Sequence, residues 1–316
     1  MAKTDRKKTS RRKIPWKRTA SLILLGFCIA AAIALTAIPN GWERTYALFG
    51  LTDVGDKADD APFSFHVLNV GKADAMLLCC EGSTMLVDCG MSDDGEDIAR
   101  YLQKRKIAHL DYAVCTHPDS DHIGGYGELL SRISANNFLL PPLPKEMTDN
   151  NPDYEEAMRV VKEKQILSGT VQAGDSLALG SAEISVLSPK KLMDSTNNNS
   201  LVLKVTYGET TLLLMGDAEA EAERLLLEQP ELLSANVLKV GHHGSKTSTT
   251  EPFLKAVSPT YGVISVGRDR NELPRDEVLR RLETHQVKTY RTDRCGDIVF
   301  TSDGKEVAVA WENENG

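Results

Sequence analysis

The sequence has 316 residues, of which 41% are hydrophobic and 26% charged, and its formal net charge is −8 at pH 7. These values fit one sizeable globular domain with an appendage. Residues 1–18 hold nine Lys and Arg against one Asp, a net charge of +8, so the remaining residues carry −16. A domain this acidic is not an obvious general polyanion binder, which argues against tight, salt-resistant binding of nucleic acid.

The N-terminal segment predicts a membrane anchor. Residues 1–18 are interpreted as a basic cytoplasmic tail, and no charged residue occurs between Thr19 and Trp42. We expect a transmembrane signal anchor over 19–38, whose nineteen residues 20–38 would span about 28 Å, close to the hydrocarbon thickness of a bilayer. The basic flank places the N-terminus in the cytoplasm and the following chain outside the cell. A cleaved signal peptide is the alternative, although its apolar region usually has only about 7–15 residues.

After the anchor we expect a linker over 39–61 and a folded domain over 62–312. Apolar runs separated by glycines predict hairpin-connected strands at the start of this domain. Residues 136–168, with several prolines, look less regular apart from one helix, and they are a candidate for one wall of a cleft. We expect strands at 63–70, 75–80, 84–88, 111–115, 183–187, 201–207, 211–215, 237–240, 261–266, 298–301 and 307–311, and helices at 96–106, 126–133, 154–164, 218–227 and 276–284.

Strands and helices alternate in two halves, and this order predicts an α/β fold with two sheets face to face and helices outside. The six cysteines do not form a disulfide framework or a zinc-finger pattern. Cys28 lies in the predicted membrane span, and the odd number that remains indicates small core residues, with one bridge between neighbouring strands left open.

Side chains that bind metals gather at the ends of predicted strands. Residues 117–122 read His-Pro-Asp-Ser-Asp-His, the strand at 211–215 is followed by Asp217, and the strand at 237–240 is followed by His242 and His243. Buried carboxylates packed this closely would repel one another without a cation. The pattern therefore predicts a hydrolytic centre with two metals, each with an open position for water. His66, His109 and His285 fall outside these clusters and are expected to serve packing or the surface.

Several motifs in order resemble a known family. They are the stretches 66–75, 116–125, 199–203, 214–217, 238–245 and 290–293, with Gly296. In these stretches the chain resembles metallo-β-lactamase-fold hydrolases, whose fold is an αββα sandwich. It is most similar to the extracellular, nuclease-like hydrolase domain of ComEC-type competence proteins.

The resemblance implies a dinuclear site with a hydroxide held between two divalent metals. It assigns His117 and Asp119 to the first metal and makes Asp217 the bridge. Asp121 would orient the attacking water and manage its proton. The second metal would be held by Asp121, His122 and His242. Mn²⁺ or Zn²⁺ is expected, and Mg²⁺ is also compatible.

The chain departs from the family pattern at several positions. Where many relatives have a histidine before Leu201, this chain has only Asn198, Asn199 and Ser200, which predicts an oxygen-rich first metal site. Lys72 takes the place of a glutamine and would attract a phosphate unless it is a solvated turn residue. The choice between His242 and His243 as the ligand stays open, with His242 favoured, because adjacent residues at a strand end point in opposite directions. Substrate-binding or supporting roles are assigned to Asp74, Asn199, His243, Ser245 and Lys246.

The resulting prediction is a membrane-anchored extracellular hydrolase that cleaves phosphodiesters, with DNA or RNA among the candidate substrates. A smaller phosphoester, such as a nucleotide or a choline-phosphate group on a surface polymer, competes with them. Hydrolysis of a carboxylic ester, lactone or amide is one alternative. A non-catalytic surface protein that retains the fold is another. Protein partners are unknown.

Overall fold

The structure of the protein is a computed structural model that describes residue 58, residues 60–267 and residues 272–313. The predicted basic tail and the predicted transmembrane segment at 19–38 lie outside this part of the chain. None of the described helices is long and apolar enough to cross a membrane.

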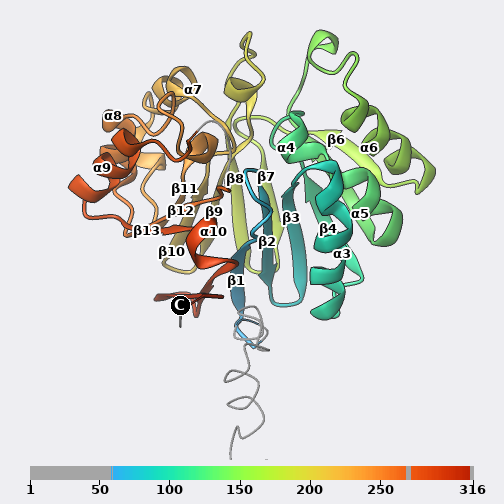
Figure 1. Ribbon diagram of the computed structural model, residues 1–316, viewed down its shortest axis with the longest axis horizontal. Coiled ribbons are helices and arrows are strands. Elements are labelled where there is room, and N and C mark those ends of the chain that lie inside the picture. Colours follow the sequence, from blue (N-terminus) through green and yellow to red (C-terminus); the bar gives the residue numbers. More distant parts are fainter. Residues whose placement is uncertain (1–57, 59, 268–271, 314–316) are drawn as a thin grey trace, which may run out of the picture. The chain divides into compact units, whose positions relative to one another are not determined.

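Two β-sheets stand at the centre of the described domain (Figure 1). The first sheet has eight strands in the order β15 (Val307–Trp311), β14 (Ile298–Ser302), β1 (Phe63–Val67), β2 (Ala75–Cys80), β3 (Ser83–Cys89), β4 (His109–Val114), β5 (Ser134–Leu140) and β6 (Leu167–Thr170). The second has seven strands in the order β13 (Lys288–Arg291), β12 (Tyr261–Ile264), β11 (Val237–Lys239), β10 (Thr210–Leu214), β9 (Val202–Tyr207), β8 (Ala182–Ser188) and β7 (Ser176–Leu179).

Helices cover the outer face of each sheet (Figure 1). The first sheet packs against α3 (Gly95–Lys104), α5 (Tyr126–Arg132) and α6 (Pro152–Glu163). The second packs against α7 (Ala220–Leu226), α8 (Glu251–Val257) and α9 (Asp276–Thr284). Short helices are α4 (Ser120–Ile123), α10 (Thr292–Cys295), η2 (Ser92–Asp94), η3 (Lys145–Met147), η4 (Asn197–Asn199), η5 (Pro230–Leu232) and η6 (Gly241–Gly244).

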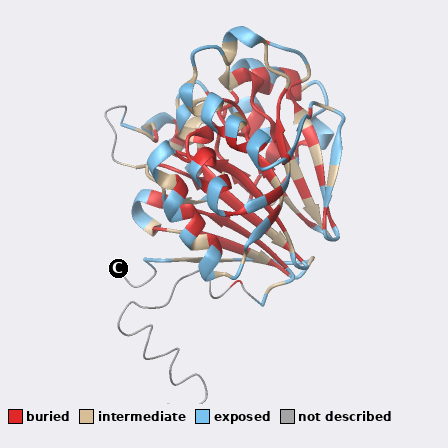
Figure 2. Cartoon of the chain, turned by 90° about the vertical axis from the view of Figure 1, so that its right-hand side faces the viewer, coloured by how far each residue is buried: buried red, intermediate tan, exposed pale blue. Residues whose placement is uncertain are grey.

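Three apolar layers hold these elements together because neighbouring strand residues face opposite sides of a sheet. Leu78 packs into the core between the two sheets, whereas the adjacent Leu77 packs under the helices of the first sheet. On the inner face of the first sheet, the rings of Phe65 on β1 and Phe300 on the neighbouring β14 stack with centroids 6.0 Å apart. Figure 2 shows the result as buried strands inside a shell of helices with exposed outer faces. The predicted αββα sandwich is confirmed.

Some elements differ from the expectation. Strand β5 begins at Ser134, so residues 136–140 belong to a strand and not to irregular chain. Strands β6, β7 and β13 and helix α8 were also not predicted. The four residues of β6 are all exposed at a sheet edge, so no apolar alternation marks this strand. The described cysteines are free, and Cys80, Cys89 and Cys115 are buried in the core as expected.

Parallel strands position the predicted metal-binding residues. Strands β3 to β6 run parallel in the first sheet, and β10 to β13 run parallel in the second. The chain segments that follow β4, β10 and β11 carry the predicted metal-binding residues. The carboxyl ends of parallel strands are where α/β folds usually place their functional loops.

Candidate metal centre

The segment after β4 folds into a tight turn that opens α4. Asp119 precedes this helix, and its carbonyl oxygen accepts hydrogen bonds from the backbone N–H groups of His122 and Ile123 at 2.9 and 3.0 Å. The turn lies close against β3, because a Cβ on Gly125 would collide with the carbonyl oxygen of Cys89. Local hydrogen bonding and this close approach therefore fix the backbone that carries Asp121 and His122.

The second sheet contributes Asp217 after β10 and a pair of histidines in η6 after β11. The backbone N–H of Asp217 donates to Ser200 Oγ at 3.1 Å. His242 and His243 both have left-handed backbones, with φ of 50° and 52°. Because they are not in extended conformation, both rings turn toward Asp217, and the expectation that they point in opposite directions is wrong.

Asp217 stands at the centre of the histidines and is only 3% exposed. Its Oδ1 lies 3.4 Å from His122 Nε2 and 3.6 Å from His243 Nε2. Its Oδ2 lies 3.6 Å from His242 Nε2 and 4.0 Å from His117 Nε2. The two oxygens of one carboxylate thus face two different pairs of histidines.

The two aspartates of the α4 segment lie on different sides of this centre. Asp119 Oδ2 is 3.7 Å from His117 Nε2, whereas Asp121 Oδ2 is 3.6 Å from His243 Nε2. The Lys72 ammonium also reaches Asp121, with Nζ 2.7 Å from Oδ2 and a side chain 26% exposed. A cation therefore stands beside the Asp121 carboxylate at a position open to solvent.

Neighbouring groups set the direction of the histidine rings. His122 Nδ1 is 2.8 Å from Asp88 Oδ2, and the same carboxylate accepts hydrogen bonds from the backbone N–H and the hydroxyl of Thr116. His243 Nδ1 donates to the carbonyl oxygen of Ser265 at 2.9 Å. In both rings Nε2 is left facing the cluster. Sequence analysis missed Asp88 and Ser265; only the acidic end of the predicted strand 84–88 pointed to the former.

A buried ion pair lies beneath the centre and joins the two sheets. Lys239 Nζ is 2.9 Å from Asp74 Oδ2, and both side chains are fully buried. The backbone N–H of Asp74 donates to the carbonyl oxygen of Asp121 at 3.0 Å. Asp74 thus contacts the α4 segment through its backbone and the second sheet through its side chain. Lys239 was not among the residues singled out from the sequence.

Charge within the cluster moves the pKa values of its members. Burial alone would raise the pKa of Asp217, but His243 and His122 hold it well below the usual value. Burial has the same tendency at Asp121, but the nearby His243, His122 and Lys72 lower its pKa. The pKa of His122 is raised well above its ordinary value, against the effect of burial, by Asp217 and Asp88. Both carboxylates are therefore ionised at neutral pH.

Several buried polar atoms in the cluster have no hydrogen-bond partner, and they face one another. They are the Nε2 atoms of His117, His122 and His243 and the Oδ1 atom of Asp217. Leaving such an atom unpaired costs about 1–3 kcal/mol, so a group of them calls for a ligand. Imidazole nitrogens and carboxylate oxygens suit Zn²⁺ and Mn²⁺. Three of them, from His117, His122 and Asp217, lie within 4.8 Å of one another, as do ligand atoms of Asp121, His122 and His243. The residues fit divalent cations.

The other predicted site residues lie around this centre. The side-chain amide of Asn199 is used by the loop before it, bonding to the backbone of Met193 and Ser195. Ser245 Oγ contacts Thr247 Oγ1 at 2.9 Å, and Lys246 is exposed on the same loop. Of the remaining histidines, His66 bonds to Tyr101 and Ser64, which is a packing role.

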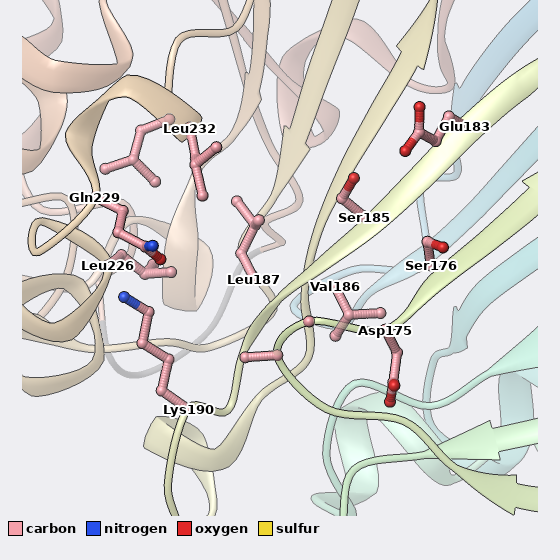
Figure 3. A pocket seen from close by; sticks show the side chains of 13 residues that line it. Asp175, Ser176, Glu183, Ser185, Val186, Leu187, Lys190, Leu226, Gln229 and Leu232 are labelled. Carbon is pink, nitrogen blue, oxygen red and sulfur yellow. The ribbon is translucent and has the colours of Figure 1, made fainter.

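A separate cavity of about 440 Å³ lies against β7 and β8 of the second sheet (Figure 3). Asp175, Glu183, Lys190 and Gln229 are among the residues that line it. No histidine or aspartate of the metal cluster contributes to its wall. We therefore place the candidate functional site at the cluster and not at this cavity.

Comparisons with known proteins agree with this geometry. The family model described as "Metallo-beta-lactamase superfamily" matches residues 68–268. The chain is 34% identical over 202 residues to ComE operon protein 3 of Bacillus subtilis, which covers 63% of this chain and 26% of that protein. It is 30% identical over 289 residues to Competence protein ComA of Neisseria gonorrhoeae, covering 89% and 39% respectively. The chain thus spans well under half the length of these relatives.

Among solved structures, the metallo-beta-lactamase fold protein YhfI of Bacillus subtilis aligns with a TM-score of 0.52. The alignment covers 78% of this chain and all of YhfI at 14% sequence identity. At that identity the likeness supports the fold alone.

Proposed function

The chain belongs to the metallo-beta-lactamase superfamily and is a metal-dependent hydrolase of that fold, and from this premise we propose that it cleaves phosphodiesters with the aid of two divalent metal ions. The observation that carries the proposal is the position of Asp217. Its two carboxylate oxygens face different pairs of histidine Nε2 atoms at 3.4–4.0 Å. A carboxylate shared in this way is typical of dinuclear hydrolytic centres.

We assign the ligands from the atoms that face one another. His117, Asp119 and Asp217 would hold the first ion. Asp121, His122 and His243 would hold the second with Asp217, so His243 replaces His242 in the assignment made from the sequence. When bound, two divalent cations supply Lewis-acid charge that activates water and neutralises charge developing on a phosphoryl group.

The residues of the chain then have separate tasks. Asp121 is ionised, so its carboxylate accepts a hydrogen bond from the attacking water and orients it. Lys72 stands 2.7 Å from Asp121 Oδ2 on the open side of the centre, where its ammonium meets an anionic oxygen of the substrate. Asp88 and Ser265 keep the rings of His122 and His243 directed at the centre.

The substrate we propose is a nucleic-acid phosphodiester or a smaller phosphodiester. The resemblance to the nuclease-like hydrolase domain of ComEC-type competence proteins supports DNA. The net charge of −16 outside residues 1–18 favours a single strand or short substrate over a long duplex, because a long polyanion would be repelled by the rest of the domain.

We also propose that residues 19–38 anchor the protein in the cell membrane, with the N-terminus in the cytoplasm and the hydrolase domain outside. The basic flank and the uncharged stretch of the sequence support this arrangement. Protease added to intact cells should then degrade the hydrolase domain, and a chain lacking residues 1–38 should leave the membrane fraction. Full protection of the domain in intact cells would contradict the proposed orientation.

Hydrolysis by the detergent-solubilised full chain tests the activity. The protein is stripped of metal, reloaded with Mn²⁺, Zn²⁺ or Mg²⁺, and given bis-p-nitrophenyl phosphate, single-stranded DNA, double-stranded DNA or p-nitrophenyl acetate. We expect metal-dependent cleavage of the phosphodiesters, reduced at least about 100-fold by Asp121→Asn. Asp149→Asn, at an exposed position, serves as the matched control. Cleavage of the acetate alone would point to a carboxylic ester, and inactivity of a folded, metal-loaded protein would refute catalysis.

A further inference from the structure

The pair of histidines in η6 has an unusual backbone. His242 and His243 follow each other with φ, ψ of 50°, 47° and 52°, 25°, both in the left-handed region. Residues other than glycine are uncommon in this region, and two in succession are rare. Strain of this kind persists where the surroundings enforce it, and it is concentrated at functional sites. Here its effect is to turn two adjacent rings toward one carboxylate.

Each ring is held by a different neighbour. His243 Nδ1 donates to the carbonyl oxygen of Ser265 at 2.9 Å. His242 Nδ1 lies 3.3 Å from Glu219 Oε1 and 3.3 Å from Thr247 Oγ1. A carboxylate on Nδ1 selects the tautomer with its proton on that atom and leaves the lone pair on Nε2. His242 thus has the supporting group of a metal ligand.

The two Nε2 atoms face opposite oxygens of Asp217. His243 Nε2 is 3.6 Å from Oδ1, and His242 Nε2 is 3.6 Å from Oδ2. Two ligand atoms on one ion, with bonds of about 2.0–2.2 Å, lie roughly 3.3–4 Å apart at ordinary coordination angles. His117 Nε2 lies 4.0 Å from the same Oδ2, and His117 also belongs to a group with His122 and Asp217 whose ligand atoms lie within 4.8 Å of one another.

We propose that both histidines are metal ligands and that they serve different ions. His242 joins His117, Asp119 and Asp217 at the first ion, with Glu219 as its positioning residue, while His243 serves the second. This assignment rests on the metal-dependent activity proposed above and deepens it.

The side chains of Asn198, Asn199 and Ser200, which stand before β9, bond to the protein backbone. Asn198 Oδ1 accepts hydrogen bonds from the backbone N–H groups of Glu219 and Ala222. The Asn199 amide is used by the 193–195 loop, and Ser200 Oγ accepts from the backbone of Asp217. These side chains build the frame around Asp217, and His242 supplies the nitrogen.

The consequence is that the two sites become alike in composition. Each has two imidazoles, one aspartate of its own and the shared Asp217. The first site is then not the oxygen-rich one that the sequence suggested, and the two ions should bind with affinities within about tenfold of each other, since the same ligand types surround both.

Metal binding tests this assignment independently of hydrolysis. The metal-free full chain in detergent is titrated with Mn²⁺, and both free Mn²⁺ and exchange coupling between bound ions are followed by electron paramagnetic resonance. The variants are His242→Asn, which keeps a residue that tolerates the left-handed backbone, and Glu219→Gln. His109→Asn, at an exposed histidine that bonds Ser134, is the matched control. Thermal unfolding of the metal-free proteins verifies that each variant folds.

The wild-type protein and His109→Asn should bind two ions that give a coupled signal. His242→Asn should keep one ion, weaken the other at least tenfold and lose the coupling, and Glu219→Gln should weaken one ion by about tenfold. If His242→Asn binds two coupled ions with unchanged affinity, the assignment is wrong, even if hydrolysis is impaired. Two ions bound in a manner that depends on His242, without cleavage of any phosphodiester, would instead support the assignment and refute the proposed function.

Discussion

The two sheets contribute residues to the candidate metal centre in different ways. From the first sheet, one short segment after β4 supplies His117, Asp119, Asp121 and His122 on the turn that opens α4. From the second sheet, Asp217 and the histidine pair come from the ends of two strands, β10 and β11, that are neighbours in space and separated in sequence. The first group is fixed by hydrogen bonds within its segment and from Asp88 and Asp74, and the second by strand alignment and a turn with left-handed residues.

Because of this difference, we expect substitutions in the segment after β4 and substitutions in the second sheet to have different effects on metal binding. In the first segment each side chain faces one side of the centre, so its loss should affect one ion. The second sheet provides the residue on which both sides meet, Asp217, and the ion pair that ties the sheets together, Lys239 with Asp74. Substitutions in the second half should therefore have the broader effect.

The largest effect is expected for Asp217→Asn. An amide cannot present two anionic oxygens, so both ions should bind weakly and kcat/KM for bis-p-nitrophenyl phosphate should fall by roughly 10³-fold, the equivalent of several kcal/mol of lost charge stabilisation. Steady-state kinetics and the Mn²⁺ titration measure the two losses. A variant that still bound two ions tightly would show that Asp217 is not shared.

The next largest effect, a loss of stability, is expected when the ion pair between Lys239 and Asp74 is broken. Lys239→Met leaves the buried Asp74 carboxylate without its partner, and the free energy of unfolding of the metal-free protein should fall by about 3–5 kcal/mol. Urea unfolding followed by fluorescence measures this. The double variant Lys239→Met/Asp74→Asn should recover much of the loss because no unpaired charge remains. Equal instability of the single and double variants would mean that packing, and not charge, explains the effect.

Asp88→Asn probes the first sheet alone. The Asp88 carboxylate holds His122 through Nδ1 at 2.8 Å, so its amide should loosen the ring and weaken one ion by about 10–100-fold while the other binds normally. The Mn²⁺ titration separates the two ions, and Asp97→Asn on the exposed face of α3 is the control. Equal weakening of both ions would contradict the division between the two halves.

The smallest effect is expected at the lysines around the centre. Lys72→Gln removes the cation beside Asp121, and KM for bis-p-nitrophenyl phosphate should rise about fivefold, as the loss of one partly exposed charged hydrogen bond of about 1 kcal/mol would give. Lys246→Gln, on the exposed loop after the histidine pair, should change KM less. A larger rise in KM for Lys246→Gln than for Lys72→Gln would place the substrate on the side of the second sheet.

The sequence predicted the parts of the fold whose pattern is local. Apolar runs marked strands such as β2, whose predicted bounds 75–80 agree with the structure, because both faces of this strand are covered. Strand β6 could not be found in this way, since all of its residues are exposed. Asp88, Glu219 and Lys239 were missed for a different reason: each acts on a residue that is distant in sequence or outside any motif.

The histidine pair in η6 also shows what could not be predicted from the sequence. The motif located His242 and His243, but the direction of their rings follows from two left-handed residues, a conformation that histidine adopts more often than most residues but that the sequence alone does not specify. The expectation of opposite directions assumed an extended strand end. Only the backbone of the folded chain brings both rings to Asp217.

The most direct test of the shared carboxylate is a crystal structure of the Mn²⁺-loaded protein with anomalous diffraction. We predict two anomalous peaks, one on each side of the Asp217 carboxylate, the first beside His117 and the second beside His122 and His243. A single peak, or two peaks that do not both touch Asp217, would contradict the dinuclear centre on which the proposed activity depends.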